Sequence, residues 1–315
     1  MSVLLDRPMP HTTTRAARRP PWFRRSLCHH EAMPATTERA ASDRPIAVFD
    51  SGVGGLTVLH ELLVSLPSED YLYLGDTARF PYGDKSQAEL QQFSLEIADH
   101  LLAAGAKLLV VACGSATASA LPLLERHLAG TGVDVLGVIA PAAQLAVEAT
   151  ESGRIGVLAT PATVSSGAYT RAIAASDPHV HLESVPCPDL APLIQSGVPL
   201  DEAAVEVVRR YTTALRRAEV DTAILGCTHF PLFAPILRRM LGRGVHLVTS
   251  GEGVVRSVER ALAARGLLNG RDGEGDYRFH CTGDVDAFRE LGTRFLQMPL
   301  GEIEQVRLEP LRAAA

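Results

Sequence analysis

Short apolar runs alternate with stretches of helical periodicity from about residue 45 onward. The runs are rich in β-branched residues, as in buried strands, and the stretches between them have the three-to-four-residue spacing of amphipathic helices. Helices are predicted at 56–66 and from a capping box at Ser86 and Glu89 to Gly105. This alternation predicts an α/β fold with mostly parallel sheets and ligands at the carboxyl ends of strands. The predicted strands cover residues 46–49, 71–74, 107–112, 135–139, 154–159, 180–185, 221–226 and 244–249.

Two of these strands end at a cysteine that small or hydroxylated residues follow, Cys113 and Cys227. Each sulfur is expected near a helix N-terminus, whose partial positive charge favours the thiolate. The order of strand, polar turn, helix, later strand and cysteine occurs twice, beginning at Asp50 and again at Thr160. Two similar halves about a pseudo-twofold axis would bring the thiols together across a cleft. Two such thiols can serve as acid and base on opposite faces of one substrate carbon.

The loops expected at this cleft offer hydroxyls and backbone N–H groups with few lysines or arginines. Helix N-termini and hydroxyls can hold the carboxylates of a small anionic ligand. Asp50 and His229 are candidates to assist proton transfer at the two thiols. The candidate ligand contacts are Asp50, Ser51, Tyr82, Gly83, Gly114, Ser115, Thr160, Thr163, Thr228 and His229.

Each feature also has a purely structural interpretation. A lone buried cysteine usually packs as a small apolar side chain, and Asp50, Thr160 and Thr163 could be helix caps. The glycines at 52, 54 and 55 lack the spacing of a dinucleotide-binding loop. The histidines do not group into a metal site, so no metal is expected.

Residues 1–44 differ in composition from the rest of the chain. They hold eight arginines, four acids and many Pro and Thr without a periodic apolar face, which predicts a disordered extension with Met33 as an alternative initiator. A transit peptide or a nucleic-acid-binding arm is the alternative. The remaining body has 22 basic and 32 acidic residues, a charge of −10, and is a poor candidate for nucleic-acid binding.

The chain has 315 residues, 46% of them hydrophobic, which suggests roughly two domains. The expected division is one domain of 45–136 plus 249–315 and another of 137–248. No apolar stretch reaches the roughly 18 residues of a membrane-spanning helix, so no membrane association is expected. Five cysteines without metal-ligand spacing indicate a reduced, cytoplasmic environment and leave Cys28, Cys187 and Cys281 without a role.

Several motifs in this order resemble the glutamate racemase family. They lie at residues 49–56, 75–83, 113–118, 225–232 and 281–284, and the likeness runs from about Ile46 to Leu296. The resemblance implies a cofactor-free racemase of two α/β domains that interconverts L- and D-glutamate for peptidoglycan synthesis, often as a homodimer. His229 after Cys-Thr favours the glutamate branch over aspartate racemases. The alternatives are a racemase of another amino acid or of a hydantoin, a one-thiol decarboxylase, and a degenerate fold that only binds or regulates.

Carried onto this chain, the family pattern makes Cys113 and Cys227 the proton-transfer residues and Asp50 and His229 their assistants. Cys113 then serves the D-enantiomer and Cys227 the L-enantiomer. The candidate contacts named above become contacts to glutamate, and no pyridoxal phosphate is expected.

Two positions depart from the family pattern. Gly114 stands where the family usually has Asn, and the lost hydrogen bond to a substrate carboxylate would cost roughly 1.5 to 3 kcal/mol. Gly114→Asn is therefore expected to lower KM by up to about 10-fold, unless the pocket has closed around the glycine. Gln195 replaces a common Glu, which removes a carboxylate near the site.

Overall fold

The computed structural model describes residues 40–197 and 201–309. Most of the predicted N-terminal extension, including Cys28 and Met33, lies outside these residues. Its last part is described, and there Ala41–Asp43 form the short 3₁₀ helix η2.

Six parallel strands form one sheet in the order β10-β9-β2-β1-β3-β4. The central strand β1 is buried along its whole length, as expected where helices cover both faces of a parallel sheet. The strands are β1 (Ile46–Asp50), β2 (Tyr71–Gly75), β3 (Leu108–Val111), β4 (Asp134–Gly137), β9 (Tyr277–Cys281) and β10 (Ile303–Gln305). The accompanying helices are α1 (Leu56–Ser65), α2 (Gln87–Ala103), α3 (Gly114–His127), α10 (Ser250–Arg265) and α11 (Val285–Leu296), with 3₁₀ helices η3 (Thr77–Arg79) and η4 (Tyr82–Asp84).

Four parallel strands form a second sheet in the order β6-β5-β7-β8. Its strands are β5 (Arg154–Ala159), β6 (His181–Pro186), β7 (Thr222–Leu225) and β8 (His246–Thr249). The helices of this part are α4 (Ile139–Ala149), α5 (Pro161–Ser165), α6 (Ala168–Ser176), α7 (Leu190–Gln195), α8 (Glu202–Arg217) and α9 (Ala234–Leu241), with the 3₁₀ helix η5 (Phe230–Phe233).

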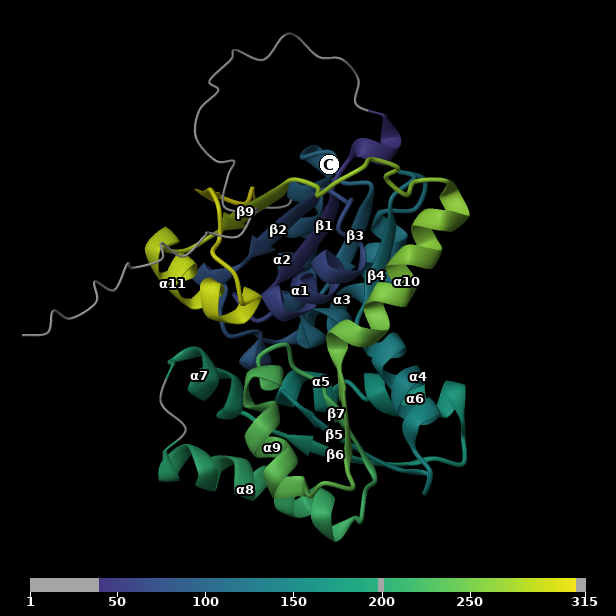
Figure 1. The fold of residues 1–315 in the computed structure, drawn as a ribbon, viewed down its shortest axis with the longest axis vertical. Helices are drawn as coiled ribbons and strands as arrows, with labels where there is room; N and C mark the ends of the chain where they lie inside the picture. The colour runs from purple at the N-terminus through teal and green to yellow at the C-terminus, as the bar shows by residue number, and fades with distance from the viewer. Residues whose placement is uncertain (1–39, 198–200, 310–315) are drawn as a thin grey trace, which may run out of the picture. The chain divides into compact units, whose positions relative to one another are not determined.

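The two sheets repeat one topology. In the first, β1 pairs with β2 and β3, and β4 follows β3; in the second, β5 pairs with β6 and β7, and β8 follows β7. Figure 1 shows these as two separate groups of strands, each with its own helices. The predicted fold class, two parallel-sheet α/β domains, is confirmed. Strands β3 and β7 are thus equivalent, and each ends just before one of the two cysteines of interest.

The predicted elements differ from the observed ones in two respects. The strand expected at 135–139 ends at Gly137, and Ile139 already begins α4, because the apolar run continues from a strand directly into a buried helix face. Strands β9 and β10 were not predicted; β10 has only three residues, too few for a periodic signal. The capping box is confirmed, since Ser86 accepts from the Glu89 N–H and the Glu89 carboxylate accepts from the Ser86 N–H.

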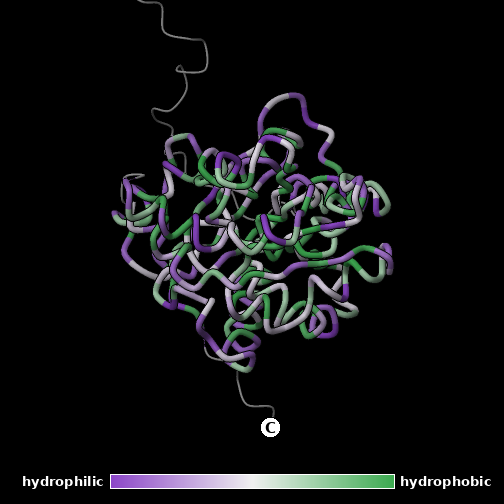
Figure 2. Tube along the Cα trace, turned by 90° about the horizontal axis from the view of Figure 1, so that it is seen from below, coloured by the Kyte–Doolittle hydropathy of each residue, from purple (hydrophilic) through white to green (hydrophobic). Residues whose placement is uncertain are grey.

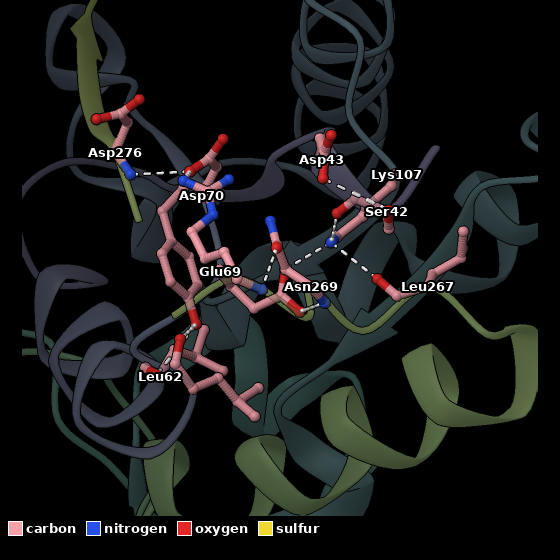
Figure 3. A network of polar contacts seen from close by, with 12 residues as sticks. Ser42, Asp43, Leu62, Glu69, Asp70, Lys107, Leu267, Asn269 and Asp276 are labelled. Carbon is pink, nitrogen blue, oxygen red and sulfur yellow. Dashed lines mark hydrogen bonds and ion pairs between the residues drawn. The ribbon is translucent and has the colours of Figure 1, made fainter. Parts of the chain in front are cut away.

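Hydrophobic side chains of both sheets and their helices form the interior, where the green segments of the trace gather in Figure 2. At the amino ends of the first sheet's strands, one buried ion pair interrupts this apolar interior (Figure 3). The Lys107 ammonium donates to the Glu69 carboxylate and to the carbonyls of Ser42 and Leu267, while the Asn269 N–H donates to Glu69 at 2.8 Å. All three ammonium protons therefore have acceptors, and the pair ties η2 and the segment after α10 to the sheet.

Candidate active site

The two cysteines line one cavity at the carboxyl ends of β3 and β7. Its enclosed free volume is only about 30 Å³, so the two domains lie nearly closed around the thiols in this structure. Eight of the ten predicted contacts line it with the cysteines: Ser51, Tyr82, Gly83, Gly114, Ser115, Thr160, Thr228 and His229. The other two, Asp50 and Thr163, are buried behind this lining.

Cys113 is the N-cap of α3, so the predicted helix after it is present. The N–H groups of Ala116 and Ser51 and the Ser51 hydroxyl lower the pKa of its thiol. Burial and the charge of Asp50 outweigh them and raise that pKa to about 12. The first turn of α3 therefore favours the thiolate as expected, but the net pKa is still raised, because desolvation of the sulfur is the larger effect.

Cys227 has a different surrounding from Cys113. The segment after it forms the 3₁₀ helix η5 from Phe230 with His229 as its N-cap, and the regular helix α9 begins only at Ala234; the His229 N–H lowers the pKa of the thiol. Burial raises the pKa of the thiol well above its usual 9.0, and the charge of Asp50 adds to the effect. The neighbour able to take its proton is His229, whose Nδ1 lies 3.9 Å from Sγ.

Two aromatic rings pack against the ring of His229. Its ring centroid lies 5.5 Å from that of Phe80 and 5.1 Å from that of Phe295 on α11. Burial lowers the pKa of the imidazole to about 3, so the ring is neutral at neutral pH. Its Nε2 lies 2.8 Å from Oε1 of Gln195, the last residue of α7. A neutral ring whose Nε2 is hydrogen-bonded to Gln195 can accept a proton from Cys227 at Nδ1.

Asp50 lies at the end of β1 and is fully buried. Its carboxylate accepts the Gly52 N–H at 3.2 Å and the Thr228 hydroxyl at 3.3 Å, a contact that joins the two domains. Burial raises the pKa of this carboxyl, while its hydrogen bonds lower it. Its effect on Cys113 is through charge, which opposes formation of the thiolate.

A chain of hydroxyls crosses from one domain to the other. Ser115 Oγ lies 2.8 Å from Thr160 Oγ1, which in turn lies 3.0 Å from Thr163 Oγ1. Thr160 is also the N-cap of α5 and accepts the Thr163 N–H, so the capping alternative for Thr160 holds together with its place in the cavity. The hydroxyls and the first turn of α3 can donate to a carboxylate.

Gly114 is in close contact with the opposite domain. A Cβ at this position would lie 2.6 Å from the carbonyl oxygen of Gly226, a distance that real Cβ atoms essentially never show. The first carbon of any side chain at this position would therefore meet backbone. Replacing Asn with Gly at position 114 has therefore not left an empty space for a side-chain amide.

The walls of the cavity are largely apolar, and most of their residues were not predicted from the sequence. The additional lining residues are Phe80, Pro81, Asp84, Pro161, Pro188, Ala191, Pro192 and Gly226. Two of them, Phe80 and Pro81, lie in the motif at 75–83 and could have been found there. The segment from Pro188 to Pro192 carries no chemical signal in the sequence, since it contributes only shape.

Buried polar contacts hold Tyr82 at the cavity. Its hydroxyl donates to the Asp76 carboxylate, which also accepts from Arg79 Nε at 2.6 Å and from the Thr282 hydroxyl at 2.7 Å. Asp76 is fully buried, so these donors fix its orientation and with it the loop that carries Tyr82. No cluster of three or more His, Cys, Asp or Glu within 40–197 and 201–309 has the arrangement of a metal site.

Comparison with known proteins accounts for this arrangement. The model of the Asp/Glu/Hydantoin racemase family matches residues 56–267, most of the described chain. The chain belongs to this racemase family. A glutamate racemase from Beutenbergia cavernae is 47% identical over 264 residues, which cover 81% of this chain and 90% of that protein. The predicted class of enzyme, an isomerase of the racemase type, is confirmed.

Solved structures of other racemases share the fold. A glutamate racemase isoform from Bacillus anthracis superposes with a TM-score of 0.80 at 35% identity, over 86% of this chain and 100% of that one. A glutamate racemase from Francisella tularensis in complex with D-glutamate superposes with a TM-score of 0.79 at 32% identity, over 85% and 99% of the two chains. In the part of this racemase that the structure describes, no helix is long and apolar enough to cross a membrane.

Proposed function

We propose that this racemase interconverts L-glutamate and D-glutamate without a cofactor, with Cys113 and Cys227 as the two proton-transfer groups. The observation that carries the proposal is that both thiols line one small cavity at equivalent strand ends of two domains with the same topology. The similarity to glutamate racemases over most of the chain supports glutamate as the substrate.

The proposed reaction uses one thiolate and one thiol at a time. The thiolate removes the α-proton from one face of glutamate, and the opposite thiol donates its proton to the other face of the carbanion. Each turnover exchanges the protonation states of the two sulfurs, so the reverse reaction needs no other groups. The family pattern assigns Cys227 to L-glutamate and Cys113 to D-glutamate.

Formation of the base is the difficult step, because burial raises the pKa of both thiols. At Cys227 the neutral imidazole of His229 is the proton acceptor, which leaves a thiolate and an imidazolium with no net change in charge. The low dielectric of the buried site that disfavours an isolated thiolate also strengthens every donor aimed at the carbanion.

Hydroxyl and backbone donors hold the substrate carboxylates in this proposal. The residues that line the described cavity include Asp84 but neither Lys nor Arg. The donors are the first turn of α3 and the hydroxyls of Ser51, Ser115, Thr160 and Thr228, with Thr163 supporting Thr160 from behind. Neutral donors orient the two carboxylates without fixing them as tightly as a salt bridge would, so product can leave.

The remaining family expectations stay proposals for this chain. They are that its D-glutamate serves peptidoglycan synthesis, that the enzyme acts as a homodimer, and that the domains divide at about residues 136 and 249. Size-exclusion chromatography with light scattering tests the dimer.

Incubation with L-glutamate in D2O tests the function. We expect α-proton loss in the proton NMR spectrum together with D-glutamate in a chiral assay. L-Aspartate and a 5-substituted hydantoin serve as matched substrates. Exchange on either of these but not on glutamate would move the enzyme to another branch of its family, and no exchange on any of the three would contradict catalysis.

A further inference from the structure

The pair formed by Gln195 and His229 has a defined polarity. Gln195 Oε1 lies 2.8 Å from Nε2 of the ring, and an amide oxygen can only accept. With the amide in this orientation, the contact assigns the ring proton to Nε2. Nδ1, on the other side of the ring, is left with its lone pair and lies 3.9 Å from the sulfur of Cys227.

The residues around the His229 ring restrict its rotation. Phe80 and Phe295 pack against it, and the Gly54 backbone is so close that a Cβ there would lie 2.4 Å from Nδ1, so the ring has little room to turn. Among the described groups that contact the ring, Cys227 alone is titratable. Asp50 lies beyond Thr228 and acts by charge on the sulfur.

We propose that Gln195 is a positioning residue that holds the proton of His229 on Nε2 and so makes Nδ1 the acceptor for the proton of Cys227. The role of Nδ1 as proton acceptor for Cys227 rests on the proposed function, whereas the assignment of the tautomer does not. When the S–H bond of Cys227 breaks, its proton forms an Nδ1–H bond, and the sulfur keeps the electron pair as thiolate. The imidazolium so formed faces an amide, which cannot neutralise its positive charge.

A neutral partner at this position makes the imidazolium short-lived. The proton on Nδ1 therefore returns readily to sulfur, and Cys227 rests as the thiol until substrate arrives. A carboxylate in place of the amide would accept from the same Nε2–H and stabilise the imidazolium by its charge. Opposite charges at such distances raise the pKa of a histidine by about 1 to 3 units.

The tautomer is read directly from the long-range proton–nitrogen spectrum of the full chain labelled with 15N-histidine at pH 7. The signals of His229 are assigned by their loss in His229→Asn. We expect Nε2 to appear protonated and Nδ1 to appear as a bare ring nitrogen. A ring protonated on Nδ1, or on both nitrogens, would overturn the proposal, because the sulfur would then face a donor.

The effect on sulfur is measured as the rate of alkylation of Cys227 by iodoacetamide at pH 7, with each cysteine peptide resolved by mass spectrometry. We expect Gln195→Glu to raise this rate about 10-fold or more, as one pKa unit corresponds to a factor of ten. Gln195→Leu, of similar size and without an acceptor, is expected to leave Nε2–H unpaired and not to raise the rate. Cys113 serves as the internal reference and should react at the same rate in all three proteins.

Equal acceleration in Gln195→Glu and Gln195→Leu, or parallel acceleration at Cys113, would show that the site had merely opened, and the proposal would fail. Neither measurement uses a substrate. A wild-type chain that showed the predicted tautomer but did not racemise glutamate would contradict the proposed function and leave the role of Gln195 intact.

Discussion

Gly114→Asn tests how closely the two domains approach at the site. Sequence comparison alone predicts that Asn restores a carboxylate contact and lowers KM, whereas the structure predicts the opposite. The new Cβ would lie 2.6 Å from the Gly226 carbonyl oxygen, about 0.8 Å short of the 3.4 Å at which ordinary contact begins. Because the obstacle is backbone on both sides, the domains must separate to admit the side chain.

The cost follows from the cost of overpacking a close-packed region, roughly 1 to 3 kcal/mol. If substrate binds to the closed arrangement, this cost appears as a KM raised by roughly 5- to 150-fold. We also expect kcat to fall, because displacing one thiol relative to the substrate by even about 1 Å costs on the order of 100-fold in rate.

Steady-state racemisation of L-glutamate, followed by circular dichroism, measures both constants. Gly114→Ala separates the effect of the Cβ from that of the amide and should already raise KM. Gly244→Asn is the matched control, since a Cβ there meets nothing within 4 Å. A KM for Gly114→Asn at or below the wild-type value would refute the reasoning, because the pocket would then have room for the amide.

Three further perturbations address the chemistry and the stability. Cys113→Ala and Cys227→Ala are each expected to abolish racemisation with little change in the thermal unfolding temperature, and full activity in either variant would exclude the two-thiol mechanism. The pKa of His229 is about 3 in the folded protein, against a usual 6.5. Between these two pH values only the unfolded chain binds a proton at this residue. The free energy of unfolding therefore falls as pH decreases from 6.5 toward 3, by roughly 1.4 kcal/mol per pH unit. His229→Asn should flatten the acid side of a plot of unfolding temperature against pH, and an unchanged slope would show that other groups dominate. Lys107→Met leaves Glu69 buried without its cation and should cost about 3 to 5 kcal/mol in urea unfolding; Arg154→Met, at the exposed pair with Glu219, should cost no more than about 1 kcal/mol, and similar losses in both would contradict this assignment.

The sequence predicted most of the strands and the meeting of the two cysteines, because a buried parallel strand leaves a local trace in the chain. Cys113 and Cys227 follow such strands directly, and the repeated order of elements was enough to place them at one cavity. Strand β9 was missed because its partner β2 is remote in sequence, and its Arg278 and His280 break the apolar run.

The protonation of the site could not be predicted in the same way. The position of Cys113 at a helix N-terminus is local and was found, but the burial that raises its pKa depends on packing with residues remote in the sequence, such as Phe49 and Leu74. Gly114 is a second example. From the sequence, its missing side chain predicted the loss of a hydrogen bond to a substrate carboxylate. Only the structure shows the carbonyl of Gly226 in that space.

The return of the chain from the second domain to the first affects how the protein can fold during synthesis. Strand β2 pairs with β9, and neighbouring residues of the two segments, Asp70 and Asp276, are 206 positions apart. The four-stranded domain is translated entirely within that interval. Until β9 leaves the ribosome, β2 is an open edge whose N–H and C=O groups can pair with another chain. The second domain can therefore be complete while the first is still at risk of aggregation.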